Sequence, residues 1–325
     1  MHITALSGGV GGARFLLGLR AALRPDDDLT VIGNTADDIW LFGLKVCPDL
    51  DSIMYTLGGG IDAERGWGRS GETWNAKEEL AAYGAEPTWF GLGDRDLATH
   101  LVRTQMLGAG YPLTEVTAAL CERWRPGVRL LPMSDDRVET HIAIDDADAP
   151  SGQRAVHFQE YWVRLRAEPA VRGVIPVGAE HATAGADVTR AIAEADVVIL
   201  PPSNPIVSIG TILSVPGIRD AVRDAAGRVV GVSPIVGGAA VRGMADPLLR
   251  GLGIEVSAAG VARHYGPRSG DGILDGWLVD ERDAGVVDEL TAAGVETRAV
   301  PLLMSDAAAT QQMARDALDL AAAAR

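Results

Sequence analysis

Short apolar runs recur along the 325-residue chain, and most are followed by a small polar loop and then by a stretch with helical periodicity. The run Asp196–Leu200 is apolar almost throughout, which is typical of a strand in a parallel sheet covered on both faces. The pattern predicts an α/β fold with a doubly wound, mostly parallel, Rossmann-like sheet. The predicted strands are His2–Leu6, Leu29–Ile32, Val128–Leu131, Val156–Leu165, Val171–Val177, Asp196–Leu200, Val229–Val232, Ile254–Ser257, Gly276–Val279 and Val295–Val300.

Between about residues 52 and 127 the pattern changes, because helical periodicity dominates and long strands disappear. We therefore predict a single domain over residues 1–325 with a mostly helical insertion at about 52–127. The helices predicted within it are Ile53–Leu57, Ala76–Tyr83, Asp96–Gly108 and Leu113–Trp124. The helices predicted beyond it are Asp187–Ala195, Val215–Ala225, Ala284–Ala293 and Ala307–Ala323.

Four of the predicted strands lead into small polar loops, at Ser7–Gly12, Gly33–Asp38, Pro202–Asn204 and Ser233–Gly238. Ligands of doubly wound sheets bind outside the carboxyl ends of the strands, so these loops predict a crevice of nucleotide size. Glycines at a helix start let backbone amides approach a phosphate, and the first loop supplies Gly8, Gly9, Gly11 and Gly12. The third Rossmann glycine is replaced by Arg14, and no Gly-Lys-Ser/Thr is present, so a tight turn without a ligand is the alternative.

An acidic stretch follows the second predicted strand. It contains an amide and four carboxylates within eighteen residues: Asn34, Asp37, Asp38, Asp49 and Asp51. In an extended segment the Asp-x-Asp spacing would point the last two carboxylates the same way. Carboxylate oxygens suit Mg²⁺, which also binds substrate phosphates. Each residue alone could instead cap a helix or a turn, but clustered carboxylates repel one another unless a cation or a proton joins them.

Composition narrows the possible functions. The net charge is −15, which argues against binding to nucleic acid or to an anionic membrane. No apolar run is long enough for a membrane helix, and no secretory signal is recognisable at the N-terminus. Cys47 and Cys121 lie far apart without metal-site spacing, so we expect free thiols in a cytoplasmic protein.

These observations favour an enzyme that binds a phosphorylated or nucleotide ligand with a divalent cation. A nicotinamide oxidoreductase is less compatible, because the glycine loop departs from the dinucleotide pattern. A non-catalytic nucleotide-binding sensor remains an alternative, although it would not require clustered carboxylates. Another Mg²⁺-dependent nucleotide-ester transferase is a third possibility.

Seven short motifs occur in order along almost the whole chain. They are Ser7-Gly8-Gly9-x-Gly11, Asn34-Thr35-Ala36-Asp37-Asp38-Ile39-Trp40, Pro48-Asp49-Leu50-Asp51, Leu92-Gly93-Asp94-Arg95-Asp96-x-Ala98-Thr99-His100, Leu131-Pro132-Met133-Ser134-Asp135-Asp136, Pro202-Ser203-Asn204-Pro205 and Val232-Ser233-Pro234-Ile235. Together they resemble the 2-phospho-L-lactate transferase family of coenzyme F420 biosynthesis. The composition is similar to that of the actinobacterial members, which the resemblance implies transfer phosphoenolpyruvate.

The resemblance implies a Mg²⁺-dependent transfer of a phosphoenolpyruvyl or 2-phospho-L-lactyl group to the terminal ribityl hydroxyl of the deazaflavin Fo. The donor is enolpyruvyl- or lactyl-diphospho-5′-guanosine, GMP leaves, and the product is dehydro-F420-0 or F420-0. The sequence does not distinguish the two donors. The resemblance also implies a cytoplasmic homodimer.

Residue roles follow from the same resemblance. Asp49 and Asp51 are the expected catalytic residues and metal ligands, and Asp37 and Asp38 are expected to support the metal. The residues expected to bind the diphosphate, the guanosine end or Fo are Gly8, Gly9, Gly11, Gly12, Asn34, Trp40, Gly91, Asp94, Arg95, Ser134, Ser203 and Asn204.

Overall fold

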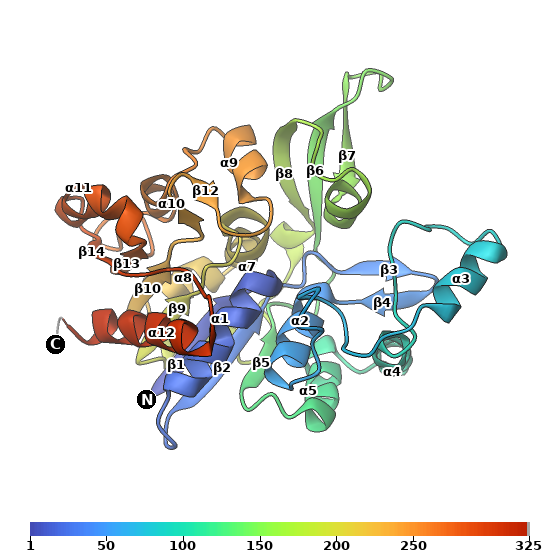
Figure 1. The fold of residues 1–325 in the computed structure, drawn as a ribbon, viewed down its shortest axis with the longest axis horizontal. Helices are drawn as coiled ribbons and strands as arrows, with labels where there is room; N and C mark the ends of the chain where they lie inside the picture. The colour runs from blue at the N-terminus through green and yellow to red at the C-terminus, as the bar shows by residue number, and fades with distance from the viewer. Residues whose placement is uncertain (324–325) are drawn as a thin grey trace.

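The computed structural model describes residues 1–323 and contains a parallel sheet of seven strands (Figure 1). The strand order is β14-β13-β10-β9-β1-β2-β5. The predicted doubly wound α/β fold is therefore confirmed. The strands are β1 (His2–Ser7), β2 (Asp28–Gly33), β5 (Arg129–Pro132), β9 (Val197–Leu200), β10 (Arg228–Val232), β13 (Gly276–Val279) and β14 (Glu296–Ala299).

The strand order reverses between β1 and β9, which are parallel neighbours in the register Ile3↔Val197. From β1 the chain passes to β2 and β5 on one side, and from β9 to β10, β13 and β14 on the other. Such a switch point separates the loops that leave the two central strands, and ligands of doubly wound sheets bind beside these loops.

Helices cover both faces of the sheet. Successive residues of a strand point to opposite faces and pack in two separate hydrophobic cores. Ile199 packs with the core that includes Phe15, whereas Leu200 packs with the core on the opposite face. In Figure 1, α1 and α12 lie side by side in front of the sheet. The helices of the sheet domain are α1 (Gly9–Ala22), α6 (Val188–Ala193), α7 (Thr211–Ser214), α8 (Ile218–Arg223), α9 (Ala245–Gly251), α10 (Ala258–Tyr265), α11 (Val287–Ala292) and α12 (Ala307–Ala322).

The segment between β2 and β5 contributes a hairpin and four helices. The hairpin extends away from the sheet toward α3 in Figure 1. Its elements are β3 (Ile39–Leu41), β4 (Leu44–Val46), α2 (Pro48–Leu57), α3 (Asn75–Ala82), α4 (Asp96–Gly108) and α5 (Leu113–Trp124). The last two helices have the predicted bounds.

A second, antiparallel sheet follows β5, with the order β7-β6-β8. Its strands are β6 (Glu139–Asp145), β7 (Gln153–His157) and β8 (Val171–Val177). The predicted strand Val156–Leu165 is wrong beyond His157, because Glu160–Arg164 forms a π-helical turn. The predicted strand Ile254–Ser257 is also wrong, because the Ser257 side chain caps α10 by accepting a hydrogen bond from the Gly260 amide at 2.9 Å.

Short elements complete the description. They are the hairpin β11 (Ile235–Val236) and β12 (Ala239–Ala240), the 3₁₀ turns Ala179–His181 and Glu281–Val286, and the π-helical turn Pro205–Gly210. Both cysteines are free thiols. Within residues 1–323, none of the helices has the length and apolar character required to cross a bilayer.

Candidate active site

Asn34 links the loops at the carboxyl ends of the central strands. It follows β2, is fully buried, and donates from Nδ2 to Asp49 Oδ2 at 2.9 Å and to the Val207 carbonyl at 3.2 Å. Its Oδ1 accepts from the Ala36 amide at 3.0 Å and from the Thr211 hydroxyl at 2.9 Å. Its amide thus joins the loops after β2 and β9 to the start of α2, and it fixes the direction of Asp49.

The expectation that Asp49 and Asp51 point the same way is wrong. Pro48 begins α2, so both residues lie in the first turn of a helix rather than in an extended segment. Successive helical residues are rotated by about 100°, so residues two apart point to nearly opposite sides. Asp49 faces Asn34 and the glycine loop, whereas Asp51 faces α4.

Asp37 and Asp49 form a buried acidic pair. The two residues are only 4% and 7% exposed, respectively. Burial, and then the charge of Asp49, raise the pKa of Asp37 well above its usual range. Burial also raises the pKa of Asp49 to about 6, against the opposing effect of hydrogen bonds from Asn34 and the Gly9 amide.

The acidic pair fits a divalent cation. Asp37 Oδ1 is buried and has no hydrogen-bond partner among the described residues. A Mg²⁺ ion would neutralise both carboxylates and keep positions for water and for phosphate oxygens. Within residues 1–323 no three His, Cys, Asp or Glu side chains are arranged to hold a metal, so the protein would contribute only these two carboxylates.

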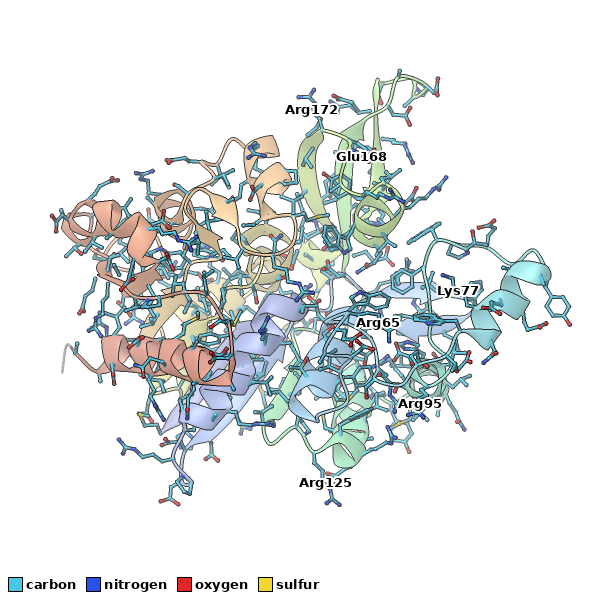
Figure 2. The ribbon with its side chains drawn as sticks, in the orientation of Figure 1. Arg65, Lys77, Arg95, Arg125, Glu168 and Arg172 are labelled. Carbon is cyan, nitrogen blue, oxygen red and sulfur yellow. The ribbon has the colours of Figure 1, made fainter. Side chains whose placement is uncertain are left out.

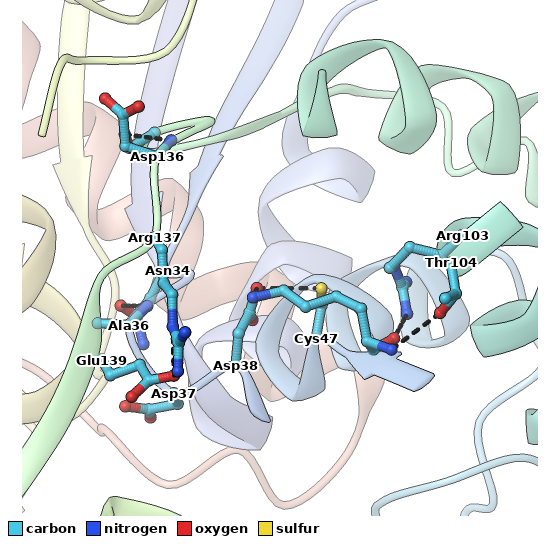
Figure 3. A network of polar contacts seen from close by, with 12 residues as sticks. Asn34, Ala36, Asp37, Asp38, Cys47, Arg103, Thr104, Asp136, Arg137 and Glu139 are labelled. Carbon is cyan, nitrogen blue, oxygen red and sulfur yellow. Dashed lines mark hydrogen bonds and ion pairs between the residues drawn. The ribbon is translucent and has the colours of Figure 1, made fainter. Parts of the chain in front are cut away.

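Asp38, one of the four carboxylates expected to bind the metal, has other partners in the structure. Its Oδ2 lies 3.1 Å from Lys45 Nζ and accepts a hydrogen bond from the Cys47 thiol at 3.0 Å. Figure 3 shows Asp38 turned toward Cys47 and Asp37 on the side of Asn34 and Glu139. The two neighbouring carboxylates therefore leave the turn in different directions.

Asp51 is likewise held by protein groups. Arg103, which is 1% exposed, binds both Asp51 oxygens, through Nη1 at 3.1 Å and through a shorter contact from Nη2. Arg103 Nη1 also donates to His100 Nδ1 at 3.1 Å, and His100 Nε2 lies 3.3 Å from Asp96 Oδ2. A buried charge network thus fastens the start of α2 to α4.

The glycine loop contacts the loop after β9 at the switch point. Ser203 Oγ donates to the Gly8 carbonyl at 2.8 Å and accepts from the Gly8 amide at 3.2 Å. A Cβ at Gly12 would lie 2.2 Å from the same Oγ, so only glycine fits there. Gly8 provides no side-chain cap for α1, and Asp49 accepts from the Gly9 amide, so the amides that follow Gly9 are the ones available for an anion.

We expect Gly8→Ala to lower turnover by at least about 10-fold, because displacement of a catalytic group is costly. The new Cβ would lie 2.5 Å from Asp49 Oδ2 and 2.8 Å from Ser208. Steady-state kinetics would measure the loss. Gly108→Ala is the matched control, because a Cβ at that helical glycine meets nothing within 4 Å. Equal turnover in the two variants would contradict the close packing of the loop against Asp49.

The side chains of Asn204 and Ser134 stabilise loops by hydrogen bonds to the backbone. Asn204 Oδ1 accepts from the amides of Ile206 and Val207, at 2.9 and 3.2 Å, and so caps the π-helical turn after β9. Ser134 Oγ donates to the Thr183 carbonyl at 2.6 Å and accepts from the Asp136 amide at 3.0 Å. Both residues lie at the carboxyl edge of the sheet with these side-chain oxygens already engaged.

Residues 91–95 pack against the start of α3 rather than against the acidic pair. Asp94 accepts hydrogen bonds from the Thr73 hydroxyl at 2.6 Å and from the Ala76 amide at 2.9 Å. These bonds lower the pKa of Asp94 to about 2, and the bond from Thr73 has the largest effect. A Cβ at Gly91 would meet Trp74 at 3.1 Å. The Arg95 amide donates to Glu72 at 2.6 Å.

Exposed aromatic and basic groups lie on the same side of the molecule. Figure 2 shows Arg65, Lys77 and Arg95 on the side that carries α3. The Arg65 guanidinium lies 5.3 Å from the ring centroids of both Trp67 and Trp74. Trp40 is 47% exposed on the neighbouring hairpin. This surface offers flat rings and positive charge.

Comparisons with known proteins agree with the fold and the motifs. The family model described as 2-phospho-L-lactate transferase CofD matches residues 3–318. A Streptomyces griseus protein named phosphoenolpyruvate transferase is 65% identical over 99% of this chain and 98% of its own length. A Nocardia farcinica protein with the same name is 58% identical over 98% of this chain and 95% of its own.

A solved structure supports the fold alone. A Bacillus halodurans protein of the UPF0052 family has a TM-score of 0.61 and 18% sequence identity, and the match covers 97% of this chain and 99% of the other. The family match extends over nearly all of the sequence that forms the sheet, the glycine loop and the acidic pair. The chain therefore belongs to the 2-phospho-L-lactate transferase (CofD) family and is a transferase.

Proposed function

We propose that this enzyme transfers the phosphoenolpyruvyl group of enolpyruvyl-diphospho-5′-guanosine to the terminal ribityl hydroxyl of Fo. The hydroxyl oxygen bonds to the phosphorus that carries the enolpyruvyl group, and the bond from that phosphorus to the bridging oxygen breaks. GMP leaves with the bridging oxygen, and dehydro-F420-0 forms. The names of the actinobacterial relatives support this donor over the lactyl ester.

The observation that carries the proposal is the position of the acidic pair. Asp49 lies between Asn34 and the N-terminus of α1, where the diphosphate of a nucleotide ester would be bound by the backbone amides that follow Gly9. Mg²⁺ bound by Asp37 and Asp49 would neutralise charge that develops on the phosphate oxygens during transfer. This combination of a carboxylate pair and free amides suits transfer of a phosphoryl-type group.

The chain's own groups have separate tasks in this proposal. The α1 amides bind the diphosphate, and Asn34 holds Asp49 in place. A carboxylate of the pair accepts the proton that the Fo hydroxyl loses. A carboxylate next to Mg²⁺ is a weak base, so positioning and charge stabilisation contribute more than proton removal. Asp51 acts indirectly, by anchoring the start of α2 to Arg103.

The family resemblance supports an assignment of the two ligands. We propose that the guanosine end binds by the loop of Ser203 and Asn204, and that Fo binds on the side of Trp40, Gly91 and Arg95. We also propose a cytoplasmic homodimer, as the family resemblance implies. Light scattering of the purified protein would measure its mass in solution and test the dimer.

A turnover assay with Fo, Mg²⁺ and each guanosine diphosphate ester tests the proposal, with products identified by mass spectrometry. We expect dehydro-F420-0 and GMP from the enolpyruvyl ester and no product after EDTA treatment. F420-0 formed from the lactyl ester alone would overturn the proposed donor. Nucleotide binding without any transfer would support a sensor instead.

A further inference from the structure

The backbone of the acidic turn, residues 34–38, receives three hydrogen bonds from the segment that contains the antiparallel sheet. Three successive carbonyls each accept one. The Thr140 amide donates to the Ala36 carbonyl at 2.6 Å. Gln159 Nε2 donates to the Asp37 carbonyl at 3.3 Å, and His157 Nε2 lies 3.1 Å from the Asp38 carbonyl. The peptide groups before and after Asp37 and Asp38 are therefore all hydrogen-bonded to this segment.

The backbone of Gln159 holds His157 in the donating state. The Gln159 backbone N–H donates to His157 Nδ1 at 3.1 Å, so that nitrogen acts as an acceptor. A neutral imidazole then carries its hydrogen on Nε2, which donates to the Asp38 carbonyl. Gln159 is 6% exposed, so its side chain has little freedom to turn away.

This anchoring bears directly on the acidic pair. Asp37 and Asp49 repel one another, and the side chain of Asp37 has an unpartnered buried oxygen rather than a protein cation to hold it. An unanchored turn would relieve the repulsion by rotating Asp37 away from Asp49. The hydrogen bonds from Gln159 to the Asp37 carbonyl and from His157 to the Asp38 carbonyl oppose that rotation.

We propose that His157 and Gln159 are positioning residues that hold the Asp37 carboxylate in its orientation toward Asp49. The antiparallel sheet would thus serve the transfer reaction by fixing the acidic turn from outside. The inference rests on the proposed function in one respect, because it takes Asp37 and Asp49 as the cation-binding pair.

Direct metal binding tests the proposal without turnover. MnCl₂ would be titrated into the full chain, and free Mn²⁺ would be measured by electron paramagnetic resonance. We expect His157→Phe and Gln159→Leu each to weaken Mn²⁺ binding by about 10-fold, the usual effect of removing an outer-shell partner. His157→Gln should bind within about 3-fold of wild type, because its amide places a donor near the position of imidazole Nε2.

Kinetics supply a second measurement that a purely structural role would not reproduce. We expect kcat of His157→Phe and Gln159→Leu to fall by about 10-fold, with KM for the guanosine ester within about 3-fold of wild type. His157→Gln should recover kcat. His141→Gln is the matched control, because His141 lies in the same sheet, 5.7 Å from the His157 ring, and its Nε2 contacts Glu139 at 3.3 Å.

The outcomes separate this inference from the proposed function. Wild-type Mn²⁺ binding and kcat in both His157→Phe and Gln159→Leu would overturn the inference. Equal impairment of His157→Gln and His157→Phe would also overturn it, because the lost donor would not be the cause. Equal Mn²⁺ binding by wild type and Asp37→Asn would remove the proposed cation pair, and the kcat pattern alone would then decide whether His157 and Gln159 position the turn.

Discussion

Asp37→Asn is expected to lower the rate of transfer by about 10²–10³-fold, the usual effect of removing one group that stabilises transition-state charge. The same variant should unfold at a higher temperature than wild type when both are free of metal. Burial and the charge of Asp49 disfavour the ionised form of Asp37, as its raised pKa shows. A neutral amide removes that repulsion, so activity and metal-free stability should change in opposite directions.

Two measurements check this prediction: kcat/KM with the enolpyruvyl ester, and thermal unfolding in EDTA and in Mg²⁺. Mg²⁺ should stabilise wild type by mass action, about 2.7 kcal/mol at a hundredfold excess over Kd, and should not stabilise Asp37→Asn. Asp148→Asn is the surface control, because Asp148 is exposed on the β6–β7 loop. A lower metal-free unfolding temperature in Asp37→Asn would contradict the interpretation of the acidic pair.

Arg103→Met should reduce the free energy of unfolding by about 3–5 kcal/mol, because it leaves a buried carboxylate without its partner. Arg103 and Asp51 are 1% and 4% exposed, so water cannot replace the lost contact. The start of α2 carries Asp49 as well, and turnover should therefore fall together with stability. Urea unfolding would measure the effect.

The double variant Asp51→Leu/Arg103→Met separates the two roles considered for Asp51. Replacing both members of a buried ion pair with apolar groups is often neutral or stabilising, so we expect most of the lost stability to return. Turnover should recover with it if Asp51 only anchors α2. A stable double variant without activity would instead assign Asp51 to the reaction itself.

The sheet could be predicted because its signals are local. Each buried strand is a short apolar run, and α4 and α5 show their periodicity over 13 and 12 residues. The strand predicted at Ile254–Ser257 is wrong because four alternating residues are too few to distinguish a strand from the approach to a capped helix. Ser257, a good N-cap residue, was the signal that could have corrected it.

The candidate site could be predicted only in part, because the side chains that pair with its polar residues lie far away in the sequence. The acidic residues are visible in the sequence, and Pro48 before Asp49 is a helix-start signal that outweighs the extended Asp-x-Asp pattern. The partner of Asp51 lies 52 residues away, and no short pattern selects Arg103. The contacts of Gln159 with Asp37 and of Thr211 with Asn34 span 122 and 177 residues.

The position of β1 has a consequence for the order in which the protein is made. β1 pairs with β2, which is synthesised soon after it, and with β9, which begins only at Val197. A nascent or truncated chain that stops before Val197 leaves an apolar strand, Ile3 to Leu6, at an open sheet edge. Open edges of this kind pair with other chains, so fragments lacking β9 should aggregate and need chaperone protection. The active site is completed at that same step, because Ser203 reaches Gly8 only when β9 has paired with β1.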